Sequence, residues 1–367
     1  MEFIDLKKQY NALREDIDQR IQAVLAHGQY ILGPEVEELE HVLAAYTGAR
    51  HCITVASGTE AILISLMAID LQPGDEVITT PFSFISVAEM VALLGAVPVF
   101  ADVEPDTCNI DPARIAEKVT SRTRAIIPVS LYGQPADMDA INAIAQRHRL
   151  VVIEDAAQSF GATYRGAKSC NLSAIACTSF FPSKPLGCYG DGGAVFTSDD
   201  NLARLMREIR THGQERRYVH SRIGVGGRMD TLQCAIILAK LKYFDWEIQE
   251  RIRLGSLYNE LFQGKVTRVQ QRTDRTSVFA QYTVMVEDRD GMQRFLKQHG
   301  IPTAVHYPVL IPEQPGYARF GPFGEFPVAS GLATRVMSLP MGPYLGSDNL
   351  HRVVEKVLEY SRGKLAA

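Results

Sequence analysis

A lysine held between two prolines is the clearest chemical signal in this sequence. Lys184 lies between Pro182 and Pro185, and it cannot lie inside a helix because proline breaks the helical ladder and restricts the residue before it. The glycines that follow, at 190, 192 and 193, let the backbone approach a ligand closely. The apolar stretch 174–181 just before it predicts a partly buried amine with a depressed pKa. Taken alone, a lysine is more typical of a solvated surface.

A carboxylate at the end of an apolar strand is the second signal. Residues 150–155 predict a buried strand that ends at Asp155, at the sheet edge where open α/β folds bind ligands. A strand-end acid and a loop-held lysine are what pyridoxal phosphate (PLP) chemistry requires. Lys184 would bind the cofactor as a Schiff base, and Asp155 would keep the pyridine nitrogen protonated. Asp155 alone is equally typical of a helix N-cap.

Small polar residues near the predicted strand ends suit the rest of such a cofactor. Ser57, Gly58 and Thr59 follow one strand and open a helix, which is a favourable place for a phosphate, although the same sequence is an ordinary N-cap. Ser179 is a second candidate phosphate ligand or simply a strand-end hydroxyl. Gln158 is a candidate partner for the phenolic oxygen or a solvated polar residue.

Three further features are candidates for cofactor or substrate contacts. Phe82 and Phe84 follow a predicted strand, and one of them, Phe84 in our assignment, can stack on the pyridine ring; core packing is the simpler alternative. The glycine-rich turn 224–230 carries Arg228, which suits a carboxylate or phosphate, unless the turn is only a flexible loop. His306 lies in a later loop and is equally typical of a structural histidine.

Composition narrows the classes of function. The 367 residues are 46% hydrophobic and 22% charged, with a formal charge of −4, so nothing favours nucleic acid or an anionic membrane as a partner. No apolar run approaches membrane-spanning length, and the N-terminus does not resemble a secretion signal; we therefore expect a cytoplasmic protein. No metal site is expected, because metal-ligand spacing is absent among the six cysteines at 52, 108, 170, 177, 188 and 234.

Strands and helices are predicted to alternate through the first two thirds of the chain. The strand candidates are near-continuous apolar runs, as in strands buried on both faces: 52–56, 76–80, 97–102, 125–130, 150–155, 174–181 and 194–197. Helices are predicted at 8–26, from 34, and near 59–70, 84–94, 136–148 and 199–210. This alternation predicts an α/β fold with a mainly parallel central sheet.

The pattern changes after about residue 230. A long helix from 229 to about 264 leads into a predicted strand at 277–286, and helices follow near 291–299 and 348–361. We therefore expect a large α/β domain over residues 1–240 and a smaller α+β domain over residues 241–367.

These segments together resemble the DegT/DnrJ/EryC1/StrS family of PLP-dependent sugar aminotransferases, which have the fold type I (aspartate aminotransferase-like) architecture. The matching segments run through nearly the whole chain: 3–6, 30–36, 57–59, 73–78, 154–158, 179–193, 228–230, 306–308 and 338–340. The resemblance implies Lys184 as the lysine that binds PLP, Asp155 at the pyridine nitrogen and Gln158 at the phenolic oxygen. It implies Gly58, Thr59 and Ser179 at the phosphate.

The resemblance also implies a homodimer in which the 224–230 loop completes the neighbouring subunit's active site. Members often carry an asparagine there that reaches the phosphate, whereas this chain has Gly226 and Gly227. We expect the backbone N–H of Gly226 to substitute for it. The expected substrate-binding positions are Tyr30, Arg228, His306 and Tyr307.

Within the family, the segments 170–173 and 180–194 resemble the subgroup that aminates C3 of UDP-linked 2-acetamido-2-deoxy-3-keto-glucuronic acid. This implies a UDP-sugar substrate, L-glutamate as donor with 2-oxoglutarate as its product, and a role in making a diamino uronic acid for a surface polysaccharide such as O-antigen. Two alternatives remain at this stage. One is an aminotransferase for a 4-keto-6-deoxy sugar nucleotide, and the other is a non-enzymatic regulatory or binding protein.

Overall fold

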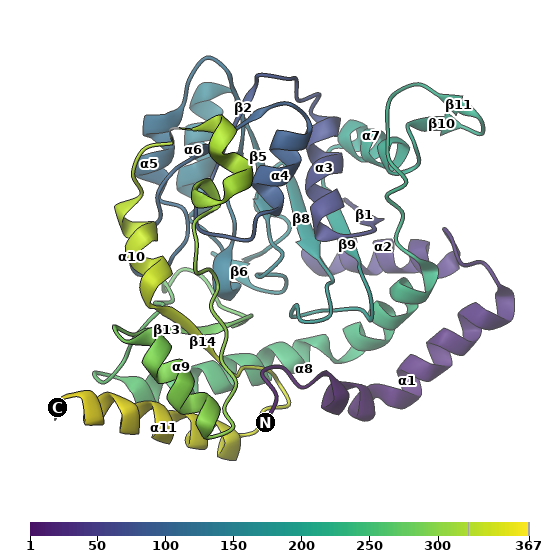
Figure 1. The fold of residues 1–367 in the computed structure, drawn as a ribbon. Coiled ribbons are helices and arrows are strands. Elements are labelled where there is room, and N and C mark those ends of the chain that lie inside the picture. The colour runs from purple at the N-terminus through teal and green to yellow at the C-terminus, as the bar shows by residue number, and fades with distance from the viewer. Residues whose placement is uncertain (322, 366–367) are drawn as a thin grey trace.

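A seven-stranded sheet sandwiched between helices forms the larger part of the computed structural model, which describes residues 1–321 and 323–365 (Figure 1). The strand order is β1-β9-β8-β5-β4-β2-β3, and only β9 runs antiparallel to its neighbours. The strands are β1 (His51–Val55), β2 (Glu76–Thr79), β3 (Val97–Phe100), β4 (Thr123–Ile127), β5 (Val151–Asp155), β8 (Ile175–Ser179) and β9 (Gly193–Thr197).

Helices cover both faces of this sheet, which explains why its strands are apolar almost without interruption. In β2 and β9 every residue is buried, and two apolar clusters that include β4 residues pack on the sheet's faces. The flanking helices are α2 (Pro34–Thr47), α3 (Gly58–Ala68), α4 (Ser86–Leu93), α5 (Pro112–Lys118), α6 (Met138–His148) and α7 (Asp200–Arg210).

Two long helices extend away from the sheet. Helix α1 (Leu6–His27) packs along α8 (Thr231–Phe262), and α8 runs from beside the large sheet to a second, smaller one (Figure 1). Leu13 and Ile17 of α1 form an apolar cluster with Ile236 and Ala239 of α8. A hairpin of β10 (Gln214–Arg216) and β11 (Val219–His220) projects from the body (Figure 1).

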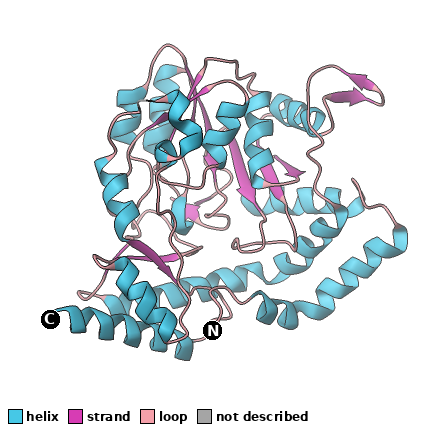
Figure 2. Ribbon diagram, in the orientation of Figure 1, coloured by secondary structure: helices cyan, strands magenta, loops and turns pink. Residues whose placement is uncertain are grey.

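The smaller sheet has the order β12-β13-β14 and is antiparallel throughout. Its strands are β12 (Thr267–Arg268), β13 (Tyr282–Met285) and β14 (Val336–Leu339), and α9 (Arg289–Gln298), α10 (Pro327–Arg335) and α11 (Ser347–Leu365) lie beside it (Figure 2). An apolar cluster of its own fills the space between α8, α9, α11 and this sheet. The remaining elements are the hairpin β6 (Thr163–Tyr164) with β7 (Ala167–Lys168), and the 3-10 turns η1 (Leu131–Gly133), η2 (Ile311–Glu313) and η3 (Pro315–Phe320).

The predicted elements of the large sheet are confirmed, with ends that shift by a few residues. The strand predicted at 277–286 is wrong in its first half, because β13 begins only at Tyr282. The Ser277 hydroxyl accepts a hydrogen bond from the Phe279 N–H, and Phe279 has a φ of 45°. This turn interrupts an extended chain, which needs negative φ. Among the described residues, no helix is long and apolar enough to cross a membrane.

Candidate active site

The predicted chemical residues lie at the carboxyl ends of adjacent strands. Asp155 ends β5 and Ser179 ends β8, while Ser57 joins β1 to α3. Because β5, β8 and β1 are parallel to one another in the sheet, these ends meet at one edge, where open α/β sheets bind ligands.

The loop after β8 folds tightly on itself and presents Lys184. The Lys184 N–H donates to the Phe181 carbonyl at 2.8 Å, and the Cys188 N–H donates to the Phe180 carbonyl at 2.8 Å. Gly187 is required here, because a Cβ at that position would lie 2.6 Å from the Pro182 oxygen. Backbone hydrogen bonds therefore close the loop over residues 180–188, and the Lys184 side chain projects from it.

Lys184 and Asp155 influence each other's charge. Burial lowers the pKa of Lys184, and the Asp155 carboxylate opposes that change. Asp155 is 6% exposed and accepts a hydrogen bond from the Ala157 N–H at 3.0 Å. Burial raises the pKa of Asp155, whereas this hydrogen bond and the charge of Lys184 lower it. The pair combines an amine that releases its proton more easily than usual with a nearby carboxylate that interacts favourably with positive charge.

The start of α3 forms a cradle suited to a phosphate. A Cβ on Gly58 would lie 2.7 Å from the Cβ of Ser179, so only glycine lets the helix start approach the end of β8 so closely. The Ser57 oxygens accept the N–H groups of Glu60 and Ala61. Within the described structure, the N–H groups of Gly58 and Thr59 have no acceptor, as expected for the first residues of a helix. Two free donors and the Ser179 hydroxyl therefore lie close together at a helix N-terminus.

Gln158 is fixed from two sides. Its Oε1 accepts a hydrogen bond from the Tyr132 N–H at 2.9 Å, and its Nε2 donates to the Tyr307 hydroxyl at 3.4 Å. Burial raises the pKa of Tyr307, and the Asp155 carboxylate raises it further. Gln158, Tyr307 and Asp155 thus form one contiguous group.

His306 is next to this group and is neutral. Its Nδ1 is 3.0 Å from the Ser338 hydroxyl, and its backbone carbonyl accepts a hydrogen bond from the Tyr132 hydroxyl. Burial lowers the pKa of His306 to about 4, and the positive charge of Lys184 contributes to that change. His306 therefore lies near Lys184 as an uncharged ring whose Nδ1 is already engaged.

Phe84, rather than Phe82, is suited to stacking on a planar ligand. Phe82 is fully buried, whereas Phe84 is 55% exposed. The ring centroids of both lie 6.5 Å from that of Tyr307. The aromatic residue with a free face is thus at the same edge as Gln158 and Asp155.

The 224–230 loop packs beside the start of α3 and does not reach Lys184 in the described structure. Gly227 accepts the Ala56 N–H through its carbonyl at 2.9 Å, and a Cβ on Gly226 would lie 3.1 Å from the His212 ring. Tyr30 accompanies the loop: its carbonyl accepts the Thr231 N–H at 3.0 Å, and its side chain is 48% exposed. Among the described residues, no contact joins Gly226, Arg228 or Tyr30 to Lys184, so one chain alone does not unite all the predicted positions.

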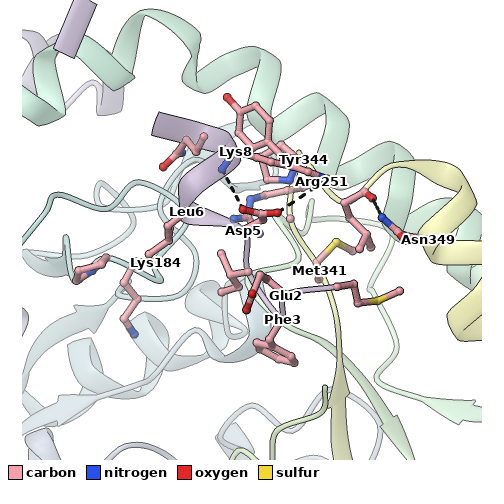
Figure 3. Close-up of a pocket in the computed structure, with 17 residues that line it drawn as sticks. Glu2, Phe3, Asp5, Leu6, Lys8, Lys184, Arg251, Met341, Tyr344 and Asn349 are labelled. Atoms are coloured by element: carbon pink, nitrogen blue, oxygen red, sulfur yellow. Dashed lines mark hydrogen bonds and ion pairs between the residues drawn. The ribbon is translucent and has the colours of Figure 1, made fainter. Parts of the chain in front are cut away.

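Sequence reasoning missed Tyr132, whose N–H donates to Gln158 and whose hydroxyl donates to the His306 carbonyl. Ser338 lies in a segment of the family resemblance, but its contact with His306 was not predicted. Sequence reasoning also missed a cavity formed by the N-terminal residues 1–9 against 341–345, with Lys184 at one end (Figure 3). In this view the Lys184 amine points away from Asp5 and Arg251, which line the cavity. The Phe3 carbonyl accepts the Met341 N–H at 3.3 Å. The segment 3–6 was part of the family resemblance, but only the fold shows that it lines the same cavity as Lys184.

The donor set fits PLP. The free N–H groups at Gly58 and Thr59 with the Ser179 hydroxyl suit its phosphate, and Asp155 suits its pyridine nitrogen. When bound, PLP supplies an electron sink for breaking bonds at the amine-bearing carbon. Of the chain's own groups, Asp155 would hold a proton at the ring nitrogen, and Lys184 Nζ, whose pKa is lowered by burial, would take up and return a proton.

Comparisons with known proteins agree over almost the full length. The model of the DegT/DnrJ/EryC1/StrS aminotransferase family matches residues 11–358. The UDP-2-acetamido-2-deoxy-3-oxo-D-glucuronate aminotransferase of Pseudomonas aeruginosa is 55% identical over 95% of this chain and 97% of its own. A pleiotropic regulatory protein of Geobacillus stearothermophilus is 44% identical over 98% of both chains. The crystal structure of NtdA from Bacillus subtilis with bound cofactor PMP superposes with a TM-score of 0.89 at 33% identity, covering 96% of this chain and 82% of that one. The chain belongs to the DegT/DnrJ/EryC1/StrS aminotransferase family, and its cofactor is PLP.

Proposed function

We propose that this protein aminates C3 of UDP-linked 2-acetamido-2-deoxy-3-keto-glucuronic acid, with L-glutamate as the amino donor. The observation that carries the proposal is the 55% identity, over 95% of the chain, to an aminotransferase named for the corresponding 3-oxo-glucuronate. The pair of Lys184 and Asp155, in which each shifts the other's pKa, supports catalysis by this chain. The product would be an activated diamino uronic acid, ready for a glycosyltransferase that builds a surface polysaccharide such as O-antigen.

The substrate's carboxylate needs a cation, and Arg228 is our candidate. Among the described residues, Arg228 has no carboxylate partner, which leaves its guanidinium available for a bidentate pair. His306 cannot supply the charge, because its pKa is lowered to about 4. His306 and Tyr307 instead offer neutral hydrogen-bonding groups on the opposite side.

A dimer with shared active sites would bring Arg228 of one subunit to Lys184 of the other, although the two residues make no contact within one chain. Tyr30 and Arg228 belong to two segments that pair through an isolated bridge between Ile31 and Asp230. The exposed side chains along this region are unusually apolar, with Tyr30, Ile31 and Leu32 each more than two fifths exposed and Ile223 at 84%. Such a surface favours burial against another protein. A second copy of the chain, bringing its own 224–230 loop to Lys184, is the partner we propose.

The phosphate site is where this chain departs from its family's pattern. Gly226 is exposed and has no side chain to reach a phosphate. We propose that its backbone N–H makes the contact in the neighbouring subunit, so the cofactor is held by backbone donors at both Gly58 and Gly226. Loss of one side-chain donor would weaken cofactor retention rather than prevent it.

Two alternatives are less well supported. A 4-keto-6-deoxy sugar has no C6 carboxylate, so an unpaired Arg228 would have no evident role. The regulatory relative is 44% identical, but a protein that only binds would not need an amine whose pKa is lowered beside a buried carboxylate.

The test compares two substrates on two proteins. Wild type and Arg228→Ala are assayed with the 3-keto-uronate and with a matched analogue in which a hydroxymethyl group replaces the C6 carboxylate. Losing a charged hydrogen bond costs about 1.5–3 kcal/mol, so Arg228→Ala should weaken the uronate about ten- to a hundredfold and affect the analogue little. Arg217→Ala, in the exposed hairpin, is the control. An equal penalty on both compounds would remove Arg228 from carboxylate recognition.

A further inference from the structure

A buried lysine, Lys240, lies in the interior between the long helix and the loop that carries Lys184. It is 1% exposed, and two further charged residues of α8, Glu247 and Arg251, are also almost fully buried. Their spacing of seven and four residues places all three along one side of the helix. Burying an ammonium is unfavourable unless other groups compensate, so an apolar residue would pack here more favourably if packing alone mattered.

The Lys240 ammonium is bound to the Lys184 loop at two places. Its Nζ donates to the Gly187 carbonyl at 2.6 Å, and it lies 4.1 Å from the centroid of the Tyr189 ring. A third contact comes from the same helix: the Tyr189 N–H donates to Gln233 Oε1 at 2.9 Å. Helix α8 therefore holds the loop on its carboxyl-terminal side through Lys240 and Gln233.

This contact acts on the segment that sets the position of Lys184. Gly187 packs against the carbonyls of Phe181 and Pro182, and a Cβ there would lie 2.6–2.7 Å from their oxygens. The Lys184 N–H is bonded to the first of these carbonyls. A displacement of Gly187 would therefore displace the turn from which the Lys184 side chain projects.

The surroundings keep Lys240 charged at neutral pH. Burial lowers its pKa to about 8, and Glu247 opposes that change. Glu247 is itself fixed by Gln9 at 2.8 Å and by Tyr344 at 3.0 Å. A charged donor makes a stronger hydrogen bond and attracts an aromatic ring face, whereas a neutral amine would do both less well.

We propose that Lys240 is a positioning residue for the reaction: by binding the Gly187 carbonyl and the Tyr189 ring, it fixes the loop that carries Lys184. This inference rests on the proposed role of Lys184 but not on the identity of the sugar. Lys240 itself touches neither Asp155 nor Lys184 in the described structure, so its effect passes through the loop backbone.

Hydrogen–deuterium exchange of the full-length protein, with and without PLP, tests the proposal. Lys240→Met keeps the length of the side chain and removes its charge. We expect exchange in peptides spanning 181–190 to rise about tenfold or more, because a hydrogen bond to a charged group is lost, while exchange in β5 is unchanged. Lys242→Met is the matched control, since Lys242 is on the same helix, half exposed and paired with Asp16. Lys240→Arg, which keeps the charge, should restore most of the protection.

A second readout follows covalent capture. Apoprotein is mixed with PLP, and samples are quenched with borohydride at intervals. The mass of the protein is then measured by mass spectrometry. Lys240→Met should capture PLP at least about tenfold more slowly than Lys242→Met. Wild-type exchange and capture in Lys240→Met would overturn the proposal. If that variant does not fold, Tyr189→Leu decides, because loss of the ring contact should also raise loop exchange, and wild-type exchange would again overturn the proposal. If Lys240→Met shows the expected faster exchange and slower capture, but the wild type does not turn over the UDP-sugar, only the proposed substrate is contradicted.

Discussion

Asp155 and Lys184 are coupled across the gap between strand β5 and the loop after β8: each shifts the other's pKa against the effect of its own burial. Burial alone would drive both groups toward their neutral forms. Each therefore stabilises the other's charged form at a site where charge is otherwise unfavourable. The charge state of each group therefore depends on the other, and a bound cofactor with charges of its own would shift the pKa of both.

The first prediction concerns Asp155. Asp155→Asn removes the negative charge that holds a proton at the pyridine nitrogen but keeps the side chain's size. We expect the variant to retain PLP and to turn over at least about a hundredfold more slowly, because proton positioning contributes on this scale. Cofactor content after unfolding and steady-state turnover are the measurements. Asp290→Asn, an exposed residue of α9, is the control. Turnover near the wild-type rate in Asp155→Asn would exclude Asp155 from the mechanism.

The second prediction concerns Glu154, the buried neighbour of Asp155. Glu154 accepts hydrogen bonds from the Ser169 hydroxyl at 2.5 Å and the Cys170 N–H at 3.0 Å, yet burial raises its pKa from 4.5 to about 7. The unfolded chain thus releases this proton near pH 4.5 while the folded chain keeps it. The stability that Glu154 contributes is therefore fully present below pH 4.5 and is lost as pH rises to about 7, with an upper bound on the order of 3 kcal/mol.

Glu154→Gln tests this pH dependence, because an amide does not titrate. Urea unfolding of wild type and variant at constant protein concentration, from pH 4.5 to 8, should give free energies whose difference shifts in favour of the variant as pH rises. Glu117→Gln, an exposed residue of α5, should show no such trend. A difference that stays constant with pH would mean that Glu154 titrates alike in the folded and unfolded states.

The third prediction concerns sharing of the active site between subunits. Lys184→Ala subunits should be inactive alone, and Arg228→Ala subunits should show only low activity at a uronate concentration below their weakened affinity. After subunit exchange, a hybrid dimer would contain one site with both Lys184 and a neighbouring Arg228, so part of the activity should return. Two differently tagged Lys184→Ala preparations, mixed in the same way, are the control and should stay inactive. No recovery after verified exchange would indicate sites built within one chain or a dispensable Arg228.

The sequence was most informative where a residue that can do chemistry lies next to a clear signal for a strand end or a loop. Pro182 and Pro185 around Lys184, and the apolar run that ends at Asp155, predicted both the residues and the sheet edge where they meet. Gly58 could be predicted to allow close approach, but not that the partner in contact is Ser179. Contacts such as Gln158 with Tyr307 or Lys240 with Gly187 join residues 149 and 53 positions apart. They depend on tertiary packing, which local sequence patterns do not encode.

The small sheet shows the same limit. Residues 277–281 have the composition of a strand, but the N–H groups of Val278 and Gln281 donate to the Tyr132–Gly133 turn instead of a neighbouring strand. Strand β14 was missed because Val336–Leu339 is only four residues long and directly follows a helix. Its pairing with β13 is a long-range contact with no local sequence signal.

The central claim is that this chain transfers an amino group to C3 of a UDP-linked 3-keto-uronic acid through Lys184. The most direct measurement incubates the PLP-loaded protein with UDP-2-acetamido-2-deoxy-3-keto-glucuronic acid and L-glutamate, and identifies the product by NMR. The account predicts a C3 amino product and 2-oxoglutarate from wild type. It predicts no turnover from Lys184→Ala, whose melting temperature should be close to that of wild type because Lys184 is not an apolar core residue. Lys242→Ala is the active control. Turnover by Lys184→Ala, or a wild type that aminates only a 4-keto-6-deoxy sugar nucleotide, would contradict the account.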